Sequence, residues 1–115
     1  MTQRAAIETF LPLTHLTYHV LLALAGKPLH GYGMIVEIEE RTAGAMQVEA
    51  GTLYAAIKRM VADGFIEPLA GNGGGRRRDY QLTTLGTELL SAESARLERL
   101  LEVAREKHVL PLGSH

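Results

Sequence analysis

The stretch E-A-G-T-L-Y-A-A-I-K-R-M-V-A-D-G, residues 49–64, has the periodicity of an amphipathic α-helix. Its bulky apolar side chains recur at i, i+4, i+7 and i+8, a spacing that places them on one face of a helix. These residues are Leu53, Ile57, Met60 and Val61. We therefore predict a helix over residues 50–63 that packs this face onto a core.

The opposite face of this helix is small and cationic. Its charged side chains are Lys58 and Arg59, and no acid occurs before Asp63. A helix face that is only solvated usually mixes both signs of charge. Lysine and arginine bind guanine edges or phosphates, whereas Thr52 and Ala55 suit a thymine methyl group. We predict a DNA recognition helix; which of these side chains contact bases rather than phosphates stays open.

Length and composition limit the classes of protein to consider. The 115 residues suffice for one domain with one core. The absence of cysteine excludes disulfides, thiolate metal sites and cysteine nucleophiles. No apolar run approaches the roughly 20 residues of a membrane span, and the first residues lack the apolar segment of a signal peptide. We therefore expect a cytoplasmic protein that does not interact with membranes.

The net charge of −1 is low for a DNA-binding protein, which is typically basic. The charges are unevenly distributed, because residues 50–80 contain five cationic and three acidic side chains. Acids concentrate instead in residues 37–40 and near the C-terminus. We therefore expect a single copy of the chain to bind non-specific DNA weakly.

The segments before residue 49 predict two further helices. Thr14 is a suitable N-cap for an apolar helix that ends at Gly26. A second helix is expected from about His30 to Thr42, and a short connector follows it. This connector joins the second helix to the predicted recognition helix at residues 50–63. Two helices joined in this way, the latter with a cationic outer face, form a helix-turn-helix.

Two short segments with strand-forming residues follow, F-I-E-P-L at 65–69 and R-D-Y-Q-L at 78–82. The Gly-rich link between them predicts a β-hairpin, which would be the wing (65–82) of a winged helix-turn-helix. Three consecutive arginines at the end of the link favour contacts with phosphates or the minor groove over a purely solubilising role. They are Arg76, Arg77 and Arg78.

A last helix is predicted from a cap at Thr83 or Thr84 to about His108. Five apolar side chains line one side of it: Leu90, Leu97, Leu100, Leu101 and Ala104. The preceding elements already close a core, so we predict that this stripe contacts a second copy of the chain. The alternative is that the helix folds back onto its own domain. A dimer would reinforce two weak DNA contacts and offer a cavity for a small hydrophobic effector.

Other motifs do not indicate catalysis, a metal or a cofactor. The G-N-G-G-G tract at 71–75 lacks the Gly-Lys-Ser/Thr ending of a phosphate-binding loop. His15 and His19 are spaced i, i+4 without a convincing third ligand, so we expect surface or interface histidines. Together the elements predict a mainly α fold of the α+β class. It comprises an arm (1–12), a winged helix-turn-helix domain (13–83), a dimerisation helix (84–110) and a tail (111–115).

Three segments resemble the PadR family of bacterial transcriptional regulators. They are H-G-Y-G-M-I-V-E-I-E-E-R at 30–41, G-T-L-Y-A-A-I-K-R-M-V-A-D-G-F-I-E at 51–67 and R-R-R-D-Y-Q-L-T-T-L-G-T-E-L-L at 76–90. The lone C-terminal helix is typical of the smaller PadR subfamily. The resemblance implies a homodimer, usually a repressor, that is released from DNA when a small molecule binds or conditions change. It also implies DNA contacts by Tyr32, Thr52, Tyr54, Lys58 and the wing arginines.

The chain departs from the family pattern at two points. Glu49-Ala50 replaces the usual Ser or Gly followed by Pro, and a carboxylate there would repel a phosphate. The chain contains no Trp, so drug binding between Trp rings, as in some small PadR proteins, is not expected. Two alternatives to an operator-binding repressor remain. One is a winged-helix protein-interaction module, and the other is a ligand sensor with secondary DNA binding.

Overall fold

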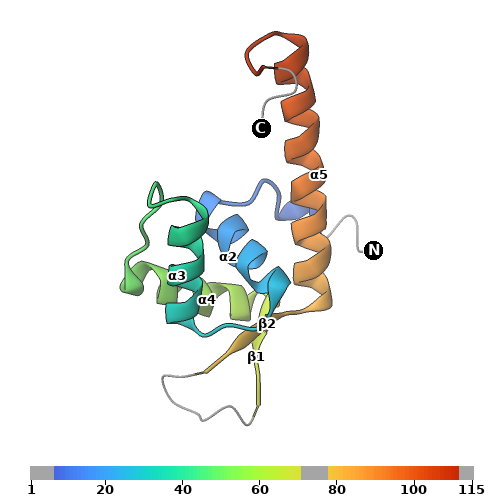
Figure 1. Cartoon of the computed structure of the whole chain (residues 1–115). Coiled ribbons are helices and arrows are strands. Elements are labelled where there is room, and N and C mark those ends of the chain that lie inside the picture. Colours follow the sequence, from blue (N-terminus) through green and yellow to red (C-terminus); the bar gives the residue numbers. More distant parts are fainter. Residues whose placement is uncertain (1–6, 71–77, 112–115) are drawn as a thin grey trace.

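The fold is mainly helical with one small sheet, as the sequence predicts. The computed structural model describes residues 7–70 and 78–111. Its elements are α2 (His15–Gly26), α3 (Gly31–Arg41), α4 (Ala50–Ala62), β1 (Ile66–Pro68), β2 (Tyr80–Leu82) and α5 (Thr84–Glu106). Helices α2 to α4 form a group with the β-hairpin on one side, while the far half of α5 projects beyond them (Figure 1). Predicted Arg76 and Arg77 lie outside the described residues.

Two helix starts, those of α2 and α5, follow the predicted capping chemistry. The Thr14 side chain accepts a hydrogen bond from the Thr17 N–H at 3.1 Å and caps α2. The Thr83 side chain accepts from the Gly86 N–H at 3.0 Å and caps α5. Helix α3 uses a histidine instead, since Nδ1 of His30 accepts from the Gly33 N–H at 3.1 Å.

One hydrophobic core joins the three helices α2, α3 and α4. Its fully buried members include Leu21 of α2, Met34 and Ile38 of α3 and Leu53 of α4. Apolar residues at helical spacing on each element therefore meet at one centre, as the periodicity predicts. Truncating such a side chain to alanine typically lowers the free energy of unfolding by about 2–5 kcal/mol.

The buried face of α4 differs at one position from the predicted face. Leu53, Ile57 and Met60 are buried, but Val61 is 36% exposed, and Ala56 at 3% takes its place. Each residue turns an α-helix by about 100°, so Val61 stands about 90° from the centre of the buried face. The prediction of a buried Val61 is therefore wrong, because it favoured a bulky side chain over a small one that is better placed.

The β-hairpin is anchored beside the helix-turn-helix by a third segment. Strands β1 and β2 are antiparallel, with Ile66 opposite Leu82 and Pro68 opposite Tyr80. Leu29, in the loop between α2 and α3, exchanges two backbone hydrogen bonds with Tyr80, of 3.2 and 2.9 Å. This bridge fixes β2 next to the start of α3.

The start of α5 is held against the first strand. The Thr83 hydroxyl donates to the carbonyls of Gly64 at 2.5 Å and Phe65 at 3.0 Å. Gly86 faces the same Phe65 carbonyl so closely that a Cβ on Gly86 would overlap the oxygen. The Y-x-L-T-x-x-G sequence at 80–86 thus joins β2 to α5. Its glycine lets the first turn of α5 pack directly against the backbone of Phe65.

The near half of α5 belongs to the chain's own core, whereas the far half is open. Leu89 and Leu90 are 0% and 8% exposed, so Leu90 leaves little surface for a second copy. Leu100 and Leu101 are 54% and 47% exposed. The predicted dimerisation stripe is therefore reduced to the residues from Leu97 onward. None of the described helices is long and apolar enough to span a membrane.

Candidate nucleic-acid interface

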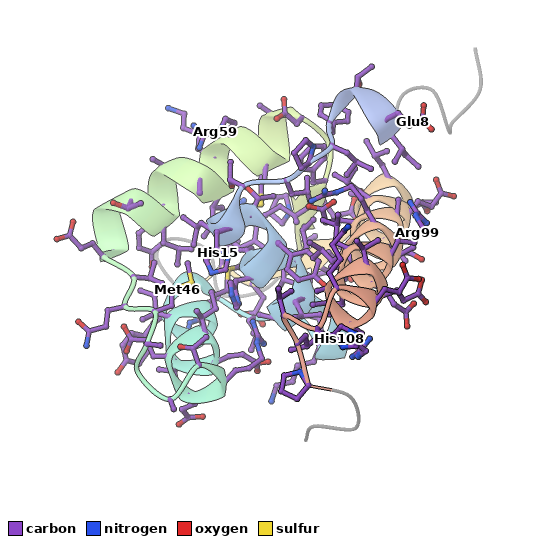
Figure 2. The ribbon with its side chains drawn as sticks, turned by 90° about the horizontal axis from the view of Figure 1, so that it is seen from above. Glu8, His15, Met46, Arg59, Arg99 and His108 are labelled. Atoms are coloured by element: carbon purple, nitrogen blue, oxygen red, sulfur yellow. The ribbon has the colours of Figure 1, made fainter. Side chains whose placement is uncertain are left out.

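The outer face of α4 presents all the predicted contact residues of this helix to solvent. Tyr54 is 46% exposed, and the other members of the set are also exposed: Thr52, Ala55, Lys58 and Arg59. Lys58 and Arg59 are the charged residues within Ala50–Ala62, so the face is purely cationic. Arg59 extends from α4 away from the body of the protein (Figure 2).

The position of Tyr54 is fixed by the start of α3. A Cβ built on Gly31 would lie 2.7 Å from Cε1, Cζ and Oη of Tyr54. The phenol ring of Tyr54 therefore crosses the first turn of α3 at Gly31, where the absence of a side chain leaves room for the ring. Gly31 of H-G-Y-G thus leaves room for Tyr54 of G-T-L-Y, so the start of α3 fixes the position of this residue of α4.

Tyr32 follows Gly31 in α3, and its side chain is 66% exposed. A large aromatic residue with so much free surface has little role in the core. Its phenol is available to donate a hydrogen bond to a partner surface. The structure therefore places Tyr32 in solvent, as a contact residue requires.

A groove separates α4 from the wing and collects residues from both. Its volume is about 290 Å³. It is lined by Tyr54, Ile57, Lys58, Val61, Pro68, Arg78 and Tyr80. Two cations from different elements, Lys58 and Arg78, thus converge on one groove with two phenols. Such a cluster is suited to a phosphate group, which attracts cations and accepts hydrogen bonds.

The groove includes some predicted residues and not others. Thr52, Ala55 and Arg59 lie on α4 outside it, and Tyr32 does not line it. Sequence reasoning missed Tyr80, which the alternation of β2 already placed on one face with Leu82. Strand alternation alone did not single it out, because the position of Tyr80 next to α4 depends on its backbone bridge to Leu29.

The N-terminus of α4 carries the acid that the sequence singled out. Glu49 occupies the N-cap position, is exposed and makes no capping hydrogen bond through its side chain. No acid follows in the first turn of α4. At the N-terminus of α4 the negative charge is therefore confined to the side chain of Glu49, next to the cationic outer face of the helix.

The two histidines of α2, spaced i, i+4, lie next to each other on the helix. The His15 and His19 ring centroids are 4.7 Å apart in an edge-to-face arrangement. Burial, with smaller contributions from the His15 and Arg41 charges, lowers the pKa of His19 below its ordinary value. In the part of the chain that the structure describes, no three metal-ligating side chains come together.

The sequence model of the PadR-like family of transcriptional regulators matches residues 20–92. The chain belongs to this family. It is therefore a transcriptional regulator and not an enzyme. The matched region contains the helix-turn-helix, the wing and the first turns of α5, which are the elements that build the surface described above.

Individual relatives extend this result. The chain is 40% identical over 81 residues to an uncharacterized 37.1 kDa protein in transposon TN4556 of Streptomyces fradiae. That match includes 70% of the chain but only 22% of the relative. A PadR family transcription regulator from Clostridium difficile R20291 has a similar structure, with a TM-score of 0.69 and 25% identity. The similarity covers 81% of this chain and 97% of that one.

The same fold occurs in a protein solved with DNA. Bacillus subtilis PadR in complex with operator DNA has a TM-score of 0.61 and 24% identity to the chain. The similarity covers 70% of this chain and 46% of that protein. At this level of identity the comparison establishes the shared fold.

Proposed function

We propose that the chain is a cytoplasmic, homodimeric repressor that binds a palindromic operator and is released by a small-molecule effector. Residues 13–83 would bind DNA through α4 and the wing, and residues 84–110 would hold the two copies together. The observation that carries the proposal is the outer face of α4, whose only charged groups are Lys58 and Arg59. A solvated helix face has no physical reason to exclude acids.

The groove between α4 and the wing supports a defined orientation on DNA. With α4 in the major groove, the DNA backbone would pass between the helix and the hairpin, where Lys58 and Arg78 meet. Thr52, Ala55 and Arg59, which lie outside the groove, would then face base edges. The complex of Bacillus subtilis PadR with operator DNA supports this use of the shared fold.

Two copies explain how a chain with a net charge of −1 would bind an operator selectively. The exposed apolar side chains Leu100 and Leu101 of α5 are available for a second copy. A two-fold dimer would place the recognition helices in successive major grooves, about 34 Å apart. Each weak contact then raises the effective concentration of the other.

The proposal is tested by fluorescence anisotropy with the duplex upstream of the chain's own gene and a scrambled duplex of equal length. Selective binding that weakens steeply with salt would support an operator-binding regulator. Equal binding of both duplexes by a folded dimer would reject it. Repression is then measured as transcription from the upstream promoter with and without the protein.

A second candidate function is a winged-helix module that binds another protein and not DNA. The net charge of −1 and the exposed carboxylate of Glu49 at the start of α4 favour it. The anisotropy experiment separates the two functions, because a protein-interaction module would bind neither duplex with a steep salt dependence.

A further inference from the structure

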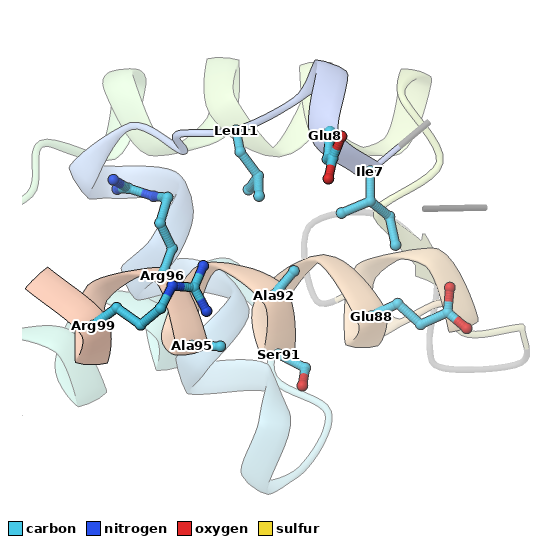
Figure 3. A pocket seen from close by; sticks show the side chains of 9 residues that line it. All are labelled: Ile7, Glu8, Leu11, Glu88, Ser91, Ala92, Ala95, Arg96 and Arg99. Carbon is cyan, nitrogen blue, oxygen red and sulfur yellow. The ribbon is translucent and has the colours of Figure 1, made fainter. Parts of the chain in front are cut away.

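A second and larger groove lies between the N-terminal segment and α5, and it shares no lining residue with the wing groove. Its volume is about 750 Å³, within the range of pockets that bind small molecules. Ile7 and Leu11 point from the N-terminal segment toward α5, where Ala92 and Ala95 form an apolar floor (Figure 3). The groove is therefore wide enough and apolar enough in its middle for an organic ligand.

The charges of this arm–α5 groove are separated along its length. Glu8 and Glu88 lie toward one end, and Arg96 and Arg99 lie toward the other (Figure 3). Glu88 to Arg99 is a distance of eleven residues along α5, or about 16 Å at ~1.5 Å per residue. The two ends therefore attract groups of opposite charge.

The acidic end contains an unsatisfied polar atom. Oε1 of Glu88 is buried, and no described residue donates a hydrogen bond to it. A buried carboxylate oxygen without a donor is unfavourable, so native proteins rarely keep one without a reason. A ligand that brings a cationic N–H donor to this oxygen would remove the penalty.

The groove and the predicted dimerisation stripe lie on opposite faces of α5. Each residue turns the helix by about 100°. Around the axis of α5, the mean direction of the groove residues Glu88, Ala95 and Arg99 is therefore about 180° from that of the stripe residues Leu97, Leu100 and Leu101. A second copy that covers the stripe would therefore leave the groove accessible. This separation favours a small molecule over a second copy as the occupant.

We propose that the arm–α5 groove binds an amphipathic organic cation. Its apolar body would pack on Ile7, Leu11 and Ala95, and its amine would donate to the carboxylate of Glu88. Binding itself does not depend on the proposed DNA function, but its regulatory role rests on that function.

A hydrogen-bonded chain connects the groove to the winged domain. Arg96, which lines the groove, donates to both carboxylate oxygens of Glu93 at 2.6 and 3.0 Å. Glu93 in turn accepts from the Leu13 N–H at 3.1 Å, at the entry to α2. A ligand against Arg96 would therefore act on the junction between α5 and α2, and so on the angle between the recognition helices of a dimer.

The test is isothermal titration calorimetry of the full chain, without DNA, against three matched probes: phenylbutylamine, phenylbutanol and phenylbutyrate. We expect the amine to bind roughly tenfold more tightly than the alcohol, which has no charge to pair with Glu88, while the acid reports separately on the arginine end of the groove. Glu88→Gln should remove the preference for the amine, whereas Glu98→Gln, an exposed acid outside the groove, should keep it. No preference for the amine in the wild type, or an unchanged preference in Glu88→Gln, would overturn the proposal.

A second variant distinguishes a ligand from a second copy. Ala95→Leu fills the floor of the groove, so amine binding should fall at least tenfold while sedimentation still shows the dimer. If Ala95→Leu dissociates the dimer instead, the groove holds a second copy and the ligand proposal is wrong. Failure of the chain to bind DNA leaves both results unchanged, because neither measurement contains DNA.

Discussion

Glu93 in α5 accepts a hydrogen bond from the backbone N–H of Leu13, which lies 80 residues earlier in the sequence. Glu93 is 2% exposed, the one buried charged residue in the described part of the chain. Its charge is compensated by Arg96, whose guanidinium makes an ion pair of 2.6 Å with it. The long C-terminal helix is thus connected through one carboxylate to the segment that enters α2.

Glu93→Gln should lower the free energy of unfolding by about 2 kcal/mol near neutral pH, because a charge-assisted network is lost from a buried position. The Arg96 hydrogen bond lowers the pKa of Glu93 below its ordinary value of 4.5, and burial opposes this shift. A lowered pKa gives stability that is present above pH 4.5 and lost as pH falls through the lowered pKa. Urea unfolding should therefore show a difference between the proteins that shrinks in acid.

Glu98→Gln is the matched control for that measurement, since Glu98 is exposed on the same helix. It should leave the midpoint of unfolding within error of the wild type. Equal behaviour of the Glu93 and Glu98 variants at every pH would contradict the assigned role of Glu93.

Gly86→Ala should destabilise the protein by about 2 kcal/mol or more, because the added methyl group overlaps the Phe65 carbonyl and must displace backbone. Gly51→Ala provides the control, since no atom lies within 4 Å of a Cβ at that helical position. It should be neutral or slightly stabilising, as alanine favours helix. Thermal unfolding followed by circular dichroism compares the two. Equal midpoints would refute the close approach at Gly86.

The contact between Gly31 and Tyr54 predicts non-additive mutations. Gly31→Ala should destabilise the wild type by about 1–3 kcal/mol, because the methyl group meets the phenol ring. In a Tyr54→Ala background the same substitution should have little effect, since the ring is gone. Chemical denaturation of the four proteins measures this coupling. An equal loss in both backgrounds would show that Gly31 is needed for another reason.

The dimer proposal predicts a face-specific effect on α5. Leu100→Glu with Leu101→Glu should convert the dimer to monomers and weaken operator binding, because two apolar contacts become charged. Val103→Glu is the control, because Val103 is 43% exposed but lies off the predicted stripe. Sedimentation velocity measures the state of each variant. A dimer that survives the double substitution would rule out this stripe as the interface.

Much of this architecture follows from local sequence. The caps at Thr14 and Thr83 and the period of α4 are properties of neighbouring residues, so they could be predicted. The burial of Glu93 could not, because it depends on a segment distant in sequence, and an acid on a helix is ordinarily solvated. The exposure of Val61 could have been predicted, because the rotation of about 100° per residue already places Ala56 nearer the centre of the buried face.

The candidate site divides in the same way. The exposed face of α4 could be predicted, because helical periodicity separates Lys58 from Leu53. The meeting of Lys58 with Arg78 and Tyr80 could not, because the position of the hairpin depends on the backbone bridge between Leu29 and Tyr80. Contacts between segments that are distant in sequence leave no trace in the local periodicity of either segment.

The most direct test of the proposed function is the salt dependence of operator affinity for the wild type and the Lys58→Ala/Arg59→Ala variant. Each phosphate contact contributes about 0.9 to the slope of log affinity against log salt. The double substitution should therefore weaken binding and flatten the slope by about 1 for each copy, because Lys58 is assigned to a phosphate and Arg59 to base edges. The charge-conserving variant Lys58→Arg/Arg59→Lys should keep the slope. Unchanged affinity and slope in the alanine variant would contradict the assignment of α4 as the recognition helix.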